Sequence, residues 1–163
     1  MLDSITSTAE HNLFLTLGIM GFGRLGKMLN LIGLNIFKDI KIYDDSYIDE
    51  DFFKKTDFLS INITLEDRNK DLINKEFIGK FKKNIYIINT ARGEVVNEDE
   101  VLDLIYDGKV LGYATDVVKE EHTPKATLLK CLNDPRILIT PHIGGTAIQA
   151  QEKAYKAVIK KIL

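Results

Sequence analysis

The sequence predicts an α/β protein with one doubly wound parallel sheet covered by helices on both faces. Short apolar runs rich in β-branched residues alternate along the chain with longer segments of helical period. Most of these runs carry hydrophobic residues at both odd and even positions, which is typical of strands buried on both faces. The chain has 163 residues, of which 45% are hydrophobic. That length suits one sizeable core, and we expect a single domain over residues 1–163.

Six strands are predicted, each a short apolar run between turn-forming residues. They are 15–20, 40–43, 58–63, 84–89, 110–117 and 136–140. Helical period predicts helices between and after them. They are 24–36, 49–55, 74–81, 97–107, 125–131 and 147–163.

Two of the helix predictions rest on named residues. Asn97 with Glu100 three residues later resembles a capping box at the start of 97–107, and Gly108 stands where a left-handed C-terminal residue belongs. In the last helix an apolar stripe recurs at steps of three and four residues. The stripe consists of Tyr155, Val158, Ile159 and Ile162.

Composition narrows the classes of function. The formal net charge of −2 comes from both signs mixed along the chain, which disfavours nucleic acid as a partner and favours a small molecule. Cys131 is the only cysteine, so an internal disulfide and a thiolate metal cluster are excluded and a reducing compartment is expected. The N-terminus has no cationic leader, and no apolar run reaches the roughly 18 residues of a membrane span. We therefore expect a cytoplasmic protein.

A glycine-rich turn is the first chemical signal. Gly21, Gly23 and Gly26 form G-x-G-x-x-G directly between a predicted strand and a predicted helix. The first glycine permits a tight turn, the second lets backbone approach a pyrophosphate, and the third lets helix and strand pack closely. The phosphates then meet unpaired N–H groups at the positive end of the helix.

An acid follows the glycine turn at the sequence spacing expected of a dinucleotide-binding site. Asp44 ends the second predicted strand, 18 residues after Gly26, where an acid binds the adenosine ribose hydroxyls. The same carboxylate repels a 2′-phosphate, so NAD is favoured over NADP. The alternative is that Asp44 only forms a turn at the end of a strand.

Three later residues suit hydride transfer on a 2-oxo acid, each just beyond a predicted strand. Arg92 offers a donor fork for a carboxylate, or is a surface arginine in a turn. His142 can exchange a proton with the substrate oxygen, or is simply a turn histidine after Pro141. Glu121 can orient the imidazole and raise its pKa, or is one acid of a solvated run.

Six stretches, taken in order, resemble the nucleotide-binding domain of the D-isomer-specific 2-hydroxyacid dehydrogenases, which include phosphoglycerate, D-lactate and glyoxylate/hydroxypyruvate enzymes. They are "GFGRLG", "YDD", "DLIN", "NTARGEVVNEDE", "ATDV" and "TPHIGGT". The resemblance runs from about Ser7 to about Gln151 and implies a Rossmann fold, bound NAD and a homodimer.

The resemblance also implies roles for single residues. Arg92 corresponds to the substrate-binding arginine, Glu121 to the acid that pairs with the histidine, and His142 to the general acid/base. Asp116 corresponds to a residue near the nicotinamide carboxamide. The implied NAD-site residues are Gly21, Gly23, Arg24, Leu25, Gly26, Asp44, Thr90, Ala91, Arg92, Asp116, His142, Ile143, Gly144 and Gly145.

The sequence departs from the family pattern at several points. Phe37 stands where a glycine ends the first helix, Thr64 replaces a proline, and Val118 and Lys119 replace an aromatic-plus-acid run. Residues 1–14 resemble only a remnant of a long linking helix. The interval from Asp44 to Phe58 is short, so we expect a sheet without the family's edge strand. The substrate-binding domain has no counterpart, and we expect a truncated relative.

Two functions remain open from the sequence. The first is an NAD-dependent oxidoreductase acting on a small 2-hydroxy or 2-oxo acid. The second is a catalytically incomplete NAD-binding module that dimerises or works with a partner chain. A serine or cysteine hydrolase is disfavoured, because no G-x-S-x-G elbow is present and no histidine lies near Cys131 in the sequence.

Overall fold

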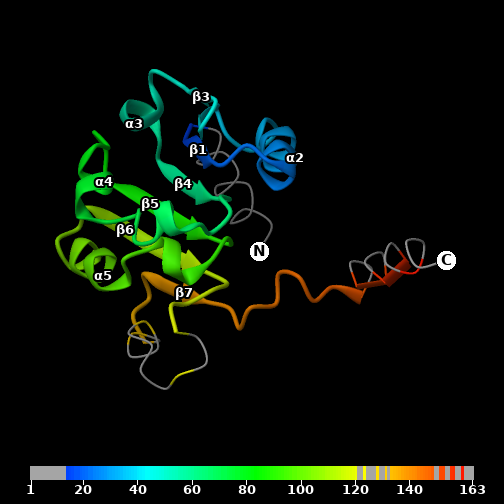
Figure 1. Cartoon of the computed structure of the whole chain (residues 1–163). Helices are drawn as coiled ribbons and strands as arrows, with labels where there is room; N and C mark the ends of the chain where they lie inside the picture. The colour runs from blue at the N-terminus through cyan, green and yellow to red at the C-terminus, as the bar shows by residue number, and fades with distance from the viewer. Residues whose placement is uncertain are drawn as a thin grey trace, which may run out of the picture.

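The computed structural model describes residues 14–120, 123, 128, 131, 133–148, 151, 152, 155, 156 and 159. These residues form one seven-stranded sheet of order β3-β2-β1-β4-β5-β6-β7 (Figure 1). The strands are β1 Thr16–Met20, β2 Asp39–Asp44, β3 Tyr47–Ile48, β4 Phe58–Ile61, β5 Ile85–Asn89, β6 Val110–Thr115 and β7 Ile137–Ile139. The helices are α2 Arg24–Gly33, α3 Phe52–Lys55, α4 Lys75–Gly79 and α5 Glu98–Tyr106.

The predicted doubly wound α/β fold is confirmed, and all six predicted strands are present. Strand β2 is longer than predicted by one residue at each end, and the other five are shorter. The expectation of a sheet without an edge strand beyond β2 is wrong. Two residues, Tyr47 and Ile48, pair antiparallel with Asp44 and Tyr43. Ser46 closes the turn between them through its hydroxyl, which donates to Asp44 Oδ1 at 3.1 Å. This tight turn lets a short interval carry both β3 and α3.

Helix ends follow the predictions in part. Asn97 caps α5 by accepting from the Glu100 N–H at 3.3 Å, but its own N–H donates to Ile73 O, so the second half of the predicted capping box is absent. Gly108 has φ +75°, as expected for a left-handed C-terminal residue. Nearly all of the predicted remnant 1–14 and most of the helix 125–131 lie outside the described residues. Seven residues of 147–163 are described, and six of these seven are helical.

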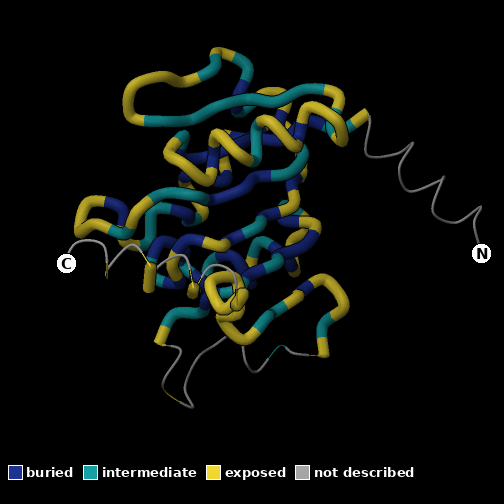
Figure 2. Tube along the Cα trace, turned by 90° about the vertical axis from the view of Figure 1, so that its right-hand side faces the viewer, coloured by how far each residue is buried: buried dark blue, intermediate teal, exposed yellow. Residues whose placement is uncertain are grey.

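The main hydrophobic core lies on one face of the sheet, beneath α3, α4 and α5. Phe52 from α3, Phe77 from α4 and Ile105 from α5 join the buried strand residues Ile87 and Tyr113 in a single cluster. Figure 2 shows the buried residues gathered in the centre of the molecule, where the strands run.

The opposite face is only half covered in the described structure. Helix α2 packs there through Gly33, where a Cβ would lie 3.0 Å from Ile40 Cδ1 and 3.2 Å from Leu17 Cδ2. Over β5, β6 and β7 no described helix covers this face, and Leu138 is 63% exposed. The prediction that most strands are buried on both faces is therefore wrong for this part of the sheet. No described helix is long and apolar enough to cross a membrane.

Candidate functional site

The candidate site lies at the carboxyl ends of the parallel strands. Strand β1 pairs with both β2 and β4, and the chain leaves β1 toward α2 on one face but leaves β4 toward α4 on the other. Such a divergence opens a crevice where α/β sheets bind ligands. A cavity of about 430 Å³ occupies this place. It is lined by Met20, Gly21, Gly23, Tyr43, Asp44, Asp45, Asn62, Ile63, Thr64, Glu66, Arg68, Asn69 and Leu72.

The glycine turn forms one wall of the cavity. Gly21 has φ +91°, and its N–H donates to Tyr43 O at 2.8 Å, which fixes the tight turn predicted there. A Cβ on Gly26 would overlap the carbonyl oxygen of Gly21, so the close approach of helix and turn requires glycine. A Cβ on Gly23 would meet nothing within 4 Å, so this backbone borders open space that a ligand can enter.

Helix α2 begins at this wall without a side-chain cap. Gly23 occupies the N-cap position, and the first turn, which carries Arg24 and Leu25, contains no acid. Both of these residues are exposed. The backbone N–H groups of the first turn and the helix dipole therefore favour an anion at this end.

Asp44 faces the glycine turn from the end of β2. Its Oδ2 accepts from the Phe22 N–H at 2.7 Å, and its Oδ1 accepts from the Ser46 hydroxyl at 3.1 Å. The Phe22 bond is the largest reason that the pKa of Asp44 lies below its usual value. An ionised carboxylate has about four acceptor positions, so Asp44 keeps capacity for a ribose hydroxyl.

Asn89, at the end of β5, shapes the turn that carries Thr90, Ala91 and Arg92. It is fully buried, its Oδ1 accepts from the Ala91 N–H at 3.0 Å, and its Nδ2 donates to Arg92 O at 3.0 Å. Arg92 itself is exposed, with Nη1 donating to Ala91 O at 2.6 Å. Sequence analysis did not select Asn89, although an Asn between a strand and a turn is a signal for this bonding.

Asp116 organises the turn after β7. Its Oδ1 accepts from the Thr140 hydroxyl and from the Ile143 N–H, and its Oδ2 accepts from the Gly144 N–H at 2.7 Å. Burial alone raises the pKa of Asp116, but these bonds outweigh burial and hold the pKa below its usual value. The sequence placed Asp116, Ile143 and Gly144 in one site, and the structure joins them directly.

His142 lies in the same turn. It is exposed, has φ +52°, and its N–H donates to Thr140 O at 2.9 Å. Its charge is one of the groups that lower the pKa of Asp116. Gly145 follows, also exposed. Glu121 lies outside the described residues.

A buried acid, Glu98 at the start of α5, binds the chain that follows β6. Only 4% of Glu98 is exposed, and its Oε1 accepts from the Lys119 N–H at 2.7 Å. Burial raises its pKa to about 7. A Cβ on Gly93 would overlap the backbone of Val118 and Lys119, so the two segments touch. The sequence does not predict this contact, because an acid such as Glu98 is common in the first turn of a helix.

Arg68 also lines the cavity. Arg68 binds Asp45 at 2.5 Å and Glu66 at 2.6 Å, so two carboxylates balance its charge. Thr64, the departure from the family pattern noted above, lines the same cavity. Among the described residues no group of His, Cys, Asp and Glu side chains is arranged to hold a metal ion. Cys131 is half-buried and packs against the core.

Comparison with known proteins agrees with this geometry. Residues 9–144 match the family "D-isomer specific 2-hydroxyacid dehydrogenase, NAD binding domain". The hydroxypyruvate reductase of Thermotoga maritima is 32% identical over 157 residues, which cover 90% of this chain and 51% of that protein. This chain thus spans about half the length of that relative.

Two solved structures superpose closely. The D-lactate dehydrogenase of Aquifex aeolicus, complexed with NAD and lactic acid, is 28% identical with a TM-score of 0.77 over 91% of this chain and 52% of that one. The NAD+-bound 3-phosphoglycerate dehydrogenase of Entamoeba histolytica is 27% identical with a TM-score of 0.78 over 93% of this chain and 51% of that one. The chain belongs to the D-isomer specific 2-hydroxyacid dehydrogenase family and corresponds to its NAD-binding domain.

Proposed function

We propose that this chain binds NAD in the cavity beside β1 and serves hydride transfer between NAD(H) and a small 2-hydroxy or 2-oxo acid. The observation that carries the proposal is the pairing of an uncapped helix N-terminus at Gly23 with the carboxylate of Asp44, which faces the same turn. A diphosphate suits the helix N-terminus, and a ribose hydroxyl suits the Asp44 carboxylate. Asp44 and Asp45 also disfavour a 2′-phosphate, and Arg68 offers no free charge to attract one.

Three residues are proposed to carry the chemistry. When bound, reduced NAD supplies the hydride. Arg92 holds the substrate carboxylate through its guanidinium fork. His142 gives a proton to the carbonyl oxygen as the carbonyl carbon accepts hydride, so a 2-oxo acid becomes a 2-hydroxy acid. Glu121 pairs with His142 and stabilises its protonated form.

The other NAD-lining residues are proposed by position. Asp116 holds the amides of Ile143 and Gly144 in place, so the turn from His142 to Gly145 forms a defined wall of the site. Asn89 does the same for Thr90 to Arg92. We propose one domain over residues 1–163, a homodimer and a cytoplasmic location.

A second function is favoured by one observation. Arg92 and His142 are both exposed in the described structure, and exposure to water weakens the electrostatic forces that orient a substrate. An NAD-binding module without turnover is the alternative that follows from this exposure.

Two measurements separate the alternatives. Calorimetry with NAD tests binding, with Asp44→Ala expected to weaken it about 10- to 100-fold. The matched control is Asp39→Ala at the opposite end of β2. Absorbance of NADH in the presence of glyoxylate, hydroxypyruvate or pyruvate tests turnover. Turnover lost in His142→Ala supports the enzyme, and binding without turnover supports the module. Absence of NAD binding by the unaltered chain overturns both.

A further inference from the structure

The chain that carries Arg92 is held on one side by backbone hydrogen bonds. Arg92 is followed by a single turn of 3-10 helix. The Asp71 N–H donates to Glu94 O at 2.8 Å. Two residues further on, the Ile73 N–H donates to Val95 O at 3.0 Å. The segment before α4 therefore fixes one edge of the Arg92 turn.

The other side of the turn rests against the chain that follows β6. A Cβ on Gly93 would overlap the backbone of Val118 and Lys119, so the two backbones are in direct contact. Only the absence of a side chain at Gly93 permits this approach. A shift of the chain at Lys119 therefore displaces or releases Gly93, the residue next to Arg92.

Lys119 is held both at its backbone and at its side chain. Its N–H donates to Glu98 Oε1 at 2.7 Å, and its ammonium group binds Asp71 at 2.9 Å. The ion pair with Asp71 is partly exposed, and exposed ion pairs contribute little to stability. The carboxylate of Glu98 belongs to a buried residue, where a hydrogen bond to a charged group is stronger. Glu98 is therefore the firmer of the two anchors.

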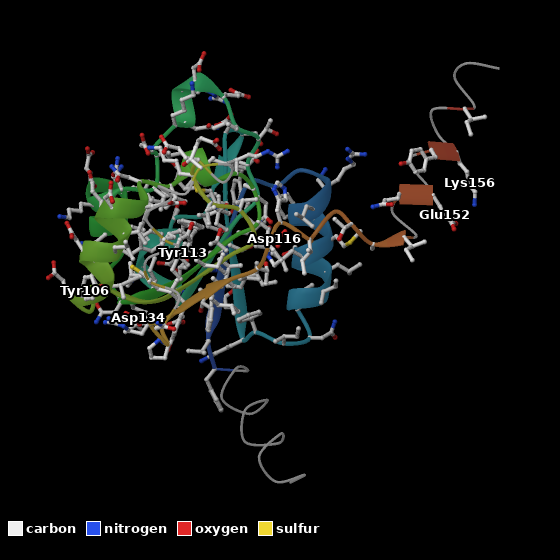
Figure 3. All side chains as sticks on the ribbon, turned by 90° about the horizontal axis from the view of Figure 1, so that it is seen from below. Tyr106, Tyr113, Asp116, Asp134, Glu152 and Lys156 are labelled. Atoms are coloured by element: carbon white, nitrogen blue, oxygen red, sulfur yellow. The ribbon has the colours of Figure 1, made fainter. Side chains whose placement is uncertain are left out.

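Glu98 also lies near the polar groups that support the Arg92 turn from below. Its charge acts on the hydroxyl of Tyr113, a buried residue of β6 in the body of the molecule (Figure 3). That hydroxyl accepts from Asn89 Nδ2 at 3.4 Å, and the same Nδ2 donates to Arg92 O at 3.0 Å. The buried acid and the turn thus share one set of neighbours.

We propose that Glu98 is a positioning residue for Arg92. By binding the Lys119 N–H, Glu98 keeps the chain after β6 against Gly93. This contact fixes the turn from which the exposed guanidinium of Arg92 reaches a substrate carboxylate. The inference rests on the proposed role of Arg92 in binding a 2-oxo acid, and Glu98 itself touches neither substrate nor NAD.

Hydrogen exchange of single amides, followed by NMR, tests the anchoring without a ligand. Glu98→Leu fills the buried space but offers no acceptor to Lys119. The Val95 N–H, which donates to Arg92 O, is expected to exchange at least about 10-fold faster in this variant. Glu98→Gln keeps an acceptor oxygen, and its Val95 exchange is expected to stay within about 3-fold of the unaltered chain. Glu98→Met is a second variant without an acceptor, for use if Glu98→Leu does not fold.

Two controls separate a local effect from a general loss of stability. Asp99→Leu is the matched substitution, because Asp99 is an exposed acid in the same helical turn. The amide of Ile19, in the buried strand β1, reports opening of the whole sheet. Unchanged Val95 exchange in the variants without an acceptor overturns the proposal. Equal acceleration at Val95 and Ile19, or in Asp99→Leu, overturns it as well.

Calorimetry then separates positioning from a purely structural role. Oxamate, an unreactive analogue of a 2-oxo acid, is titrated into the chain saturated with NADH. Glu98→Leu is expected to weaken oxamate binding about 10-fold and NADH binding by less than about 3-fold, because most of the proposed cofactor contacts lie elsewhere. Glu98→Gln is expected to restore oxamate binding. Equal loss of both affinities, or no loss of oxamate affinity, overturns the proposal.

Failure of the proposed function gives a different result. An unaltered chain that binds no NADH contradicts the cofactor site, and one that binds NADH but no oxamate contradicts the role of Arg92. In either case the hydrogen exchange of Val95 still decides whether Glu98 holds the turn.

Discussion

Neutralising the buried acid Glu98 is expected to stabilise the protein at alkaline pH. Its carboxylate is almost fully buried and accepts the Lys119 N–H. Burial raises the pKa of Glu98 from 4.5 to about 7. The charged groups around it are Lys119, Asp99 and Glu94. Glu98→Gln keeps an acceptor oxygen for Lys119 and removes the charge that burial disfavours.

The direction of the effect follows from proton uptake. Between pH 4.5 and about 7 the folded protein holds the Glu98 proton more tightly than the unfolded chain does, so the free energy of unfolding falls as pH rises through this range. Below pH 4.5 Glu98 is protonated in both the folded and the unfolded chain, and its contribution to the free energy of unfolding is complete. Above about pH 7 this contribution is lost.

The magnitude is bounded by the same numbers. A rise of about 2.5 pKa units corresponds to at most about 3 kcal/mol at 1.36 kcal/mol per unit. Relaxation and water entry reduce this limit, so Glu98→Gln is expected to add about 1–2 kcal/mol at pH 8.5. For a chain of this size the melting temperature rises by roughly 2–8 °C.

The assay is thermal unfolding followed by circular dichroism at pH 5 and pH 8.5. Asp99→Asn is the matched control, because Asp99 is an exposed acid in the same helical turn. Its loss costs only the small helix-dipole contribution of about 0.3–1 kcal/mol. The reasoning is refuted if Glu98→Gln gives no larger gain at pH 8.5 than at pH 5, or if Asp99→Asn shows the same gain.

Three further substitutions test the packing around the site. Gly93→Ala places a Cβ inside the backbone of Val118 and is expected to cost more than about 3 kcal/mol in urea unfolding, whereas Gly79→Ala, with open space around it, is expected to cost almost nothing. Asn89→Ala removes the hydrogen bonds that the buried Asn89 side chain makes to Ala91, Arg92 and Tyr113, and is expected to cost about 1–3 kcal/mol and to weaken NAD binding measured by calorimetry. Ile87→Ala opens a cavity in the core and is expected to lower stability by about 2–5 kcal/mol in the same unfolding assay. Equal effects for Gly93→Ala and Gly79→Ala, or neutral results for the other two, contradict the packing described.

The parts of the site that the sequence predicts are those fixed by local geometry. Gly21 needs a positive φ and Gly26 has no room for a side chain. Both positions therefore require glycine, and the sequence alone predicts the turn. Asp44 belongs with them, because a parallel strand beside β1 places its end next to the glycine turn. The strands themselves follow from short apolar runs between turn residues.

What the sequence does not predict depends on contacts between distant segments. Glu98 is buried where the Lys119 N–H donates to it and where Gly93 packs against Val118 and Lys119, and nothing near position 98 signals these contacts. Strand β3 has two residues, too few for any periodic pattern. The uncovered part of the sheet face over β5, β6 and β7 was missed for another reason. Apolar residues on both sides of a strand predict that both faces of the sheet are covered, but they do not show which segment of the chain covers each face.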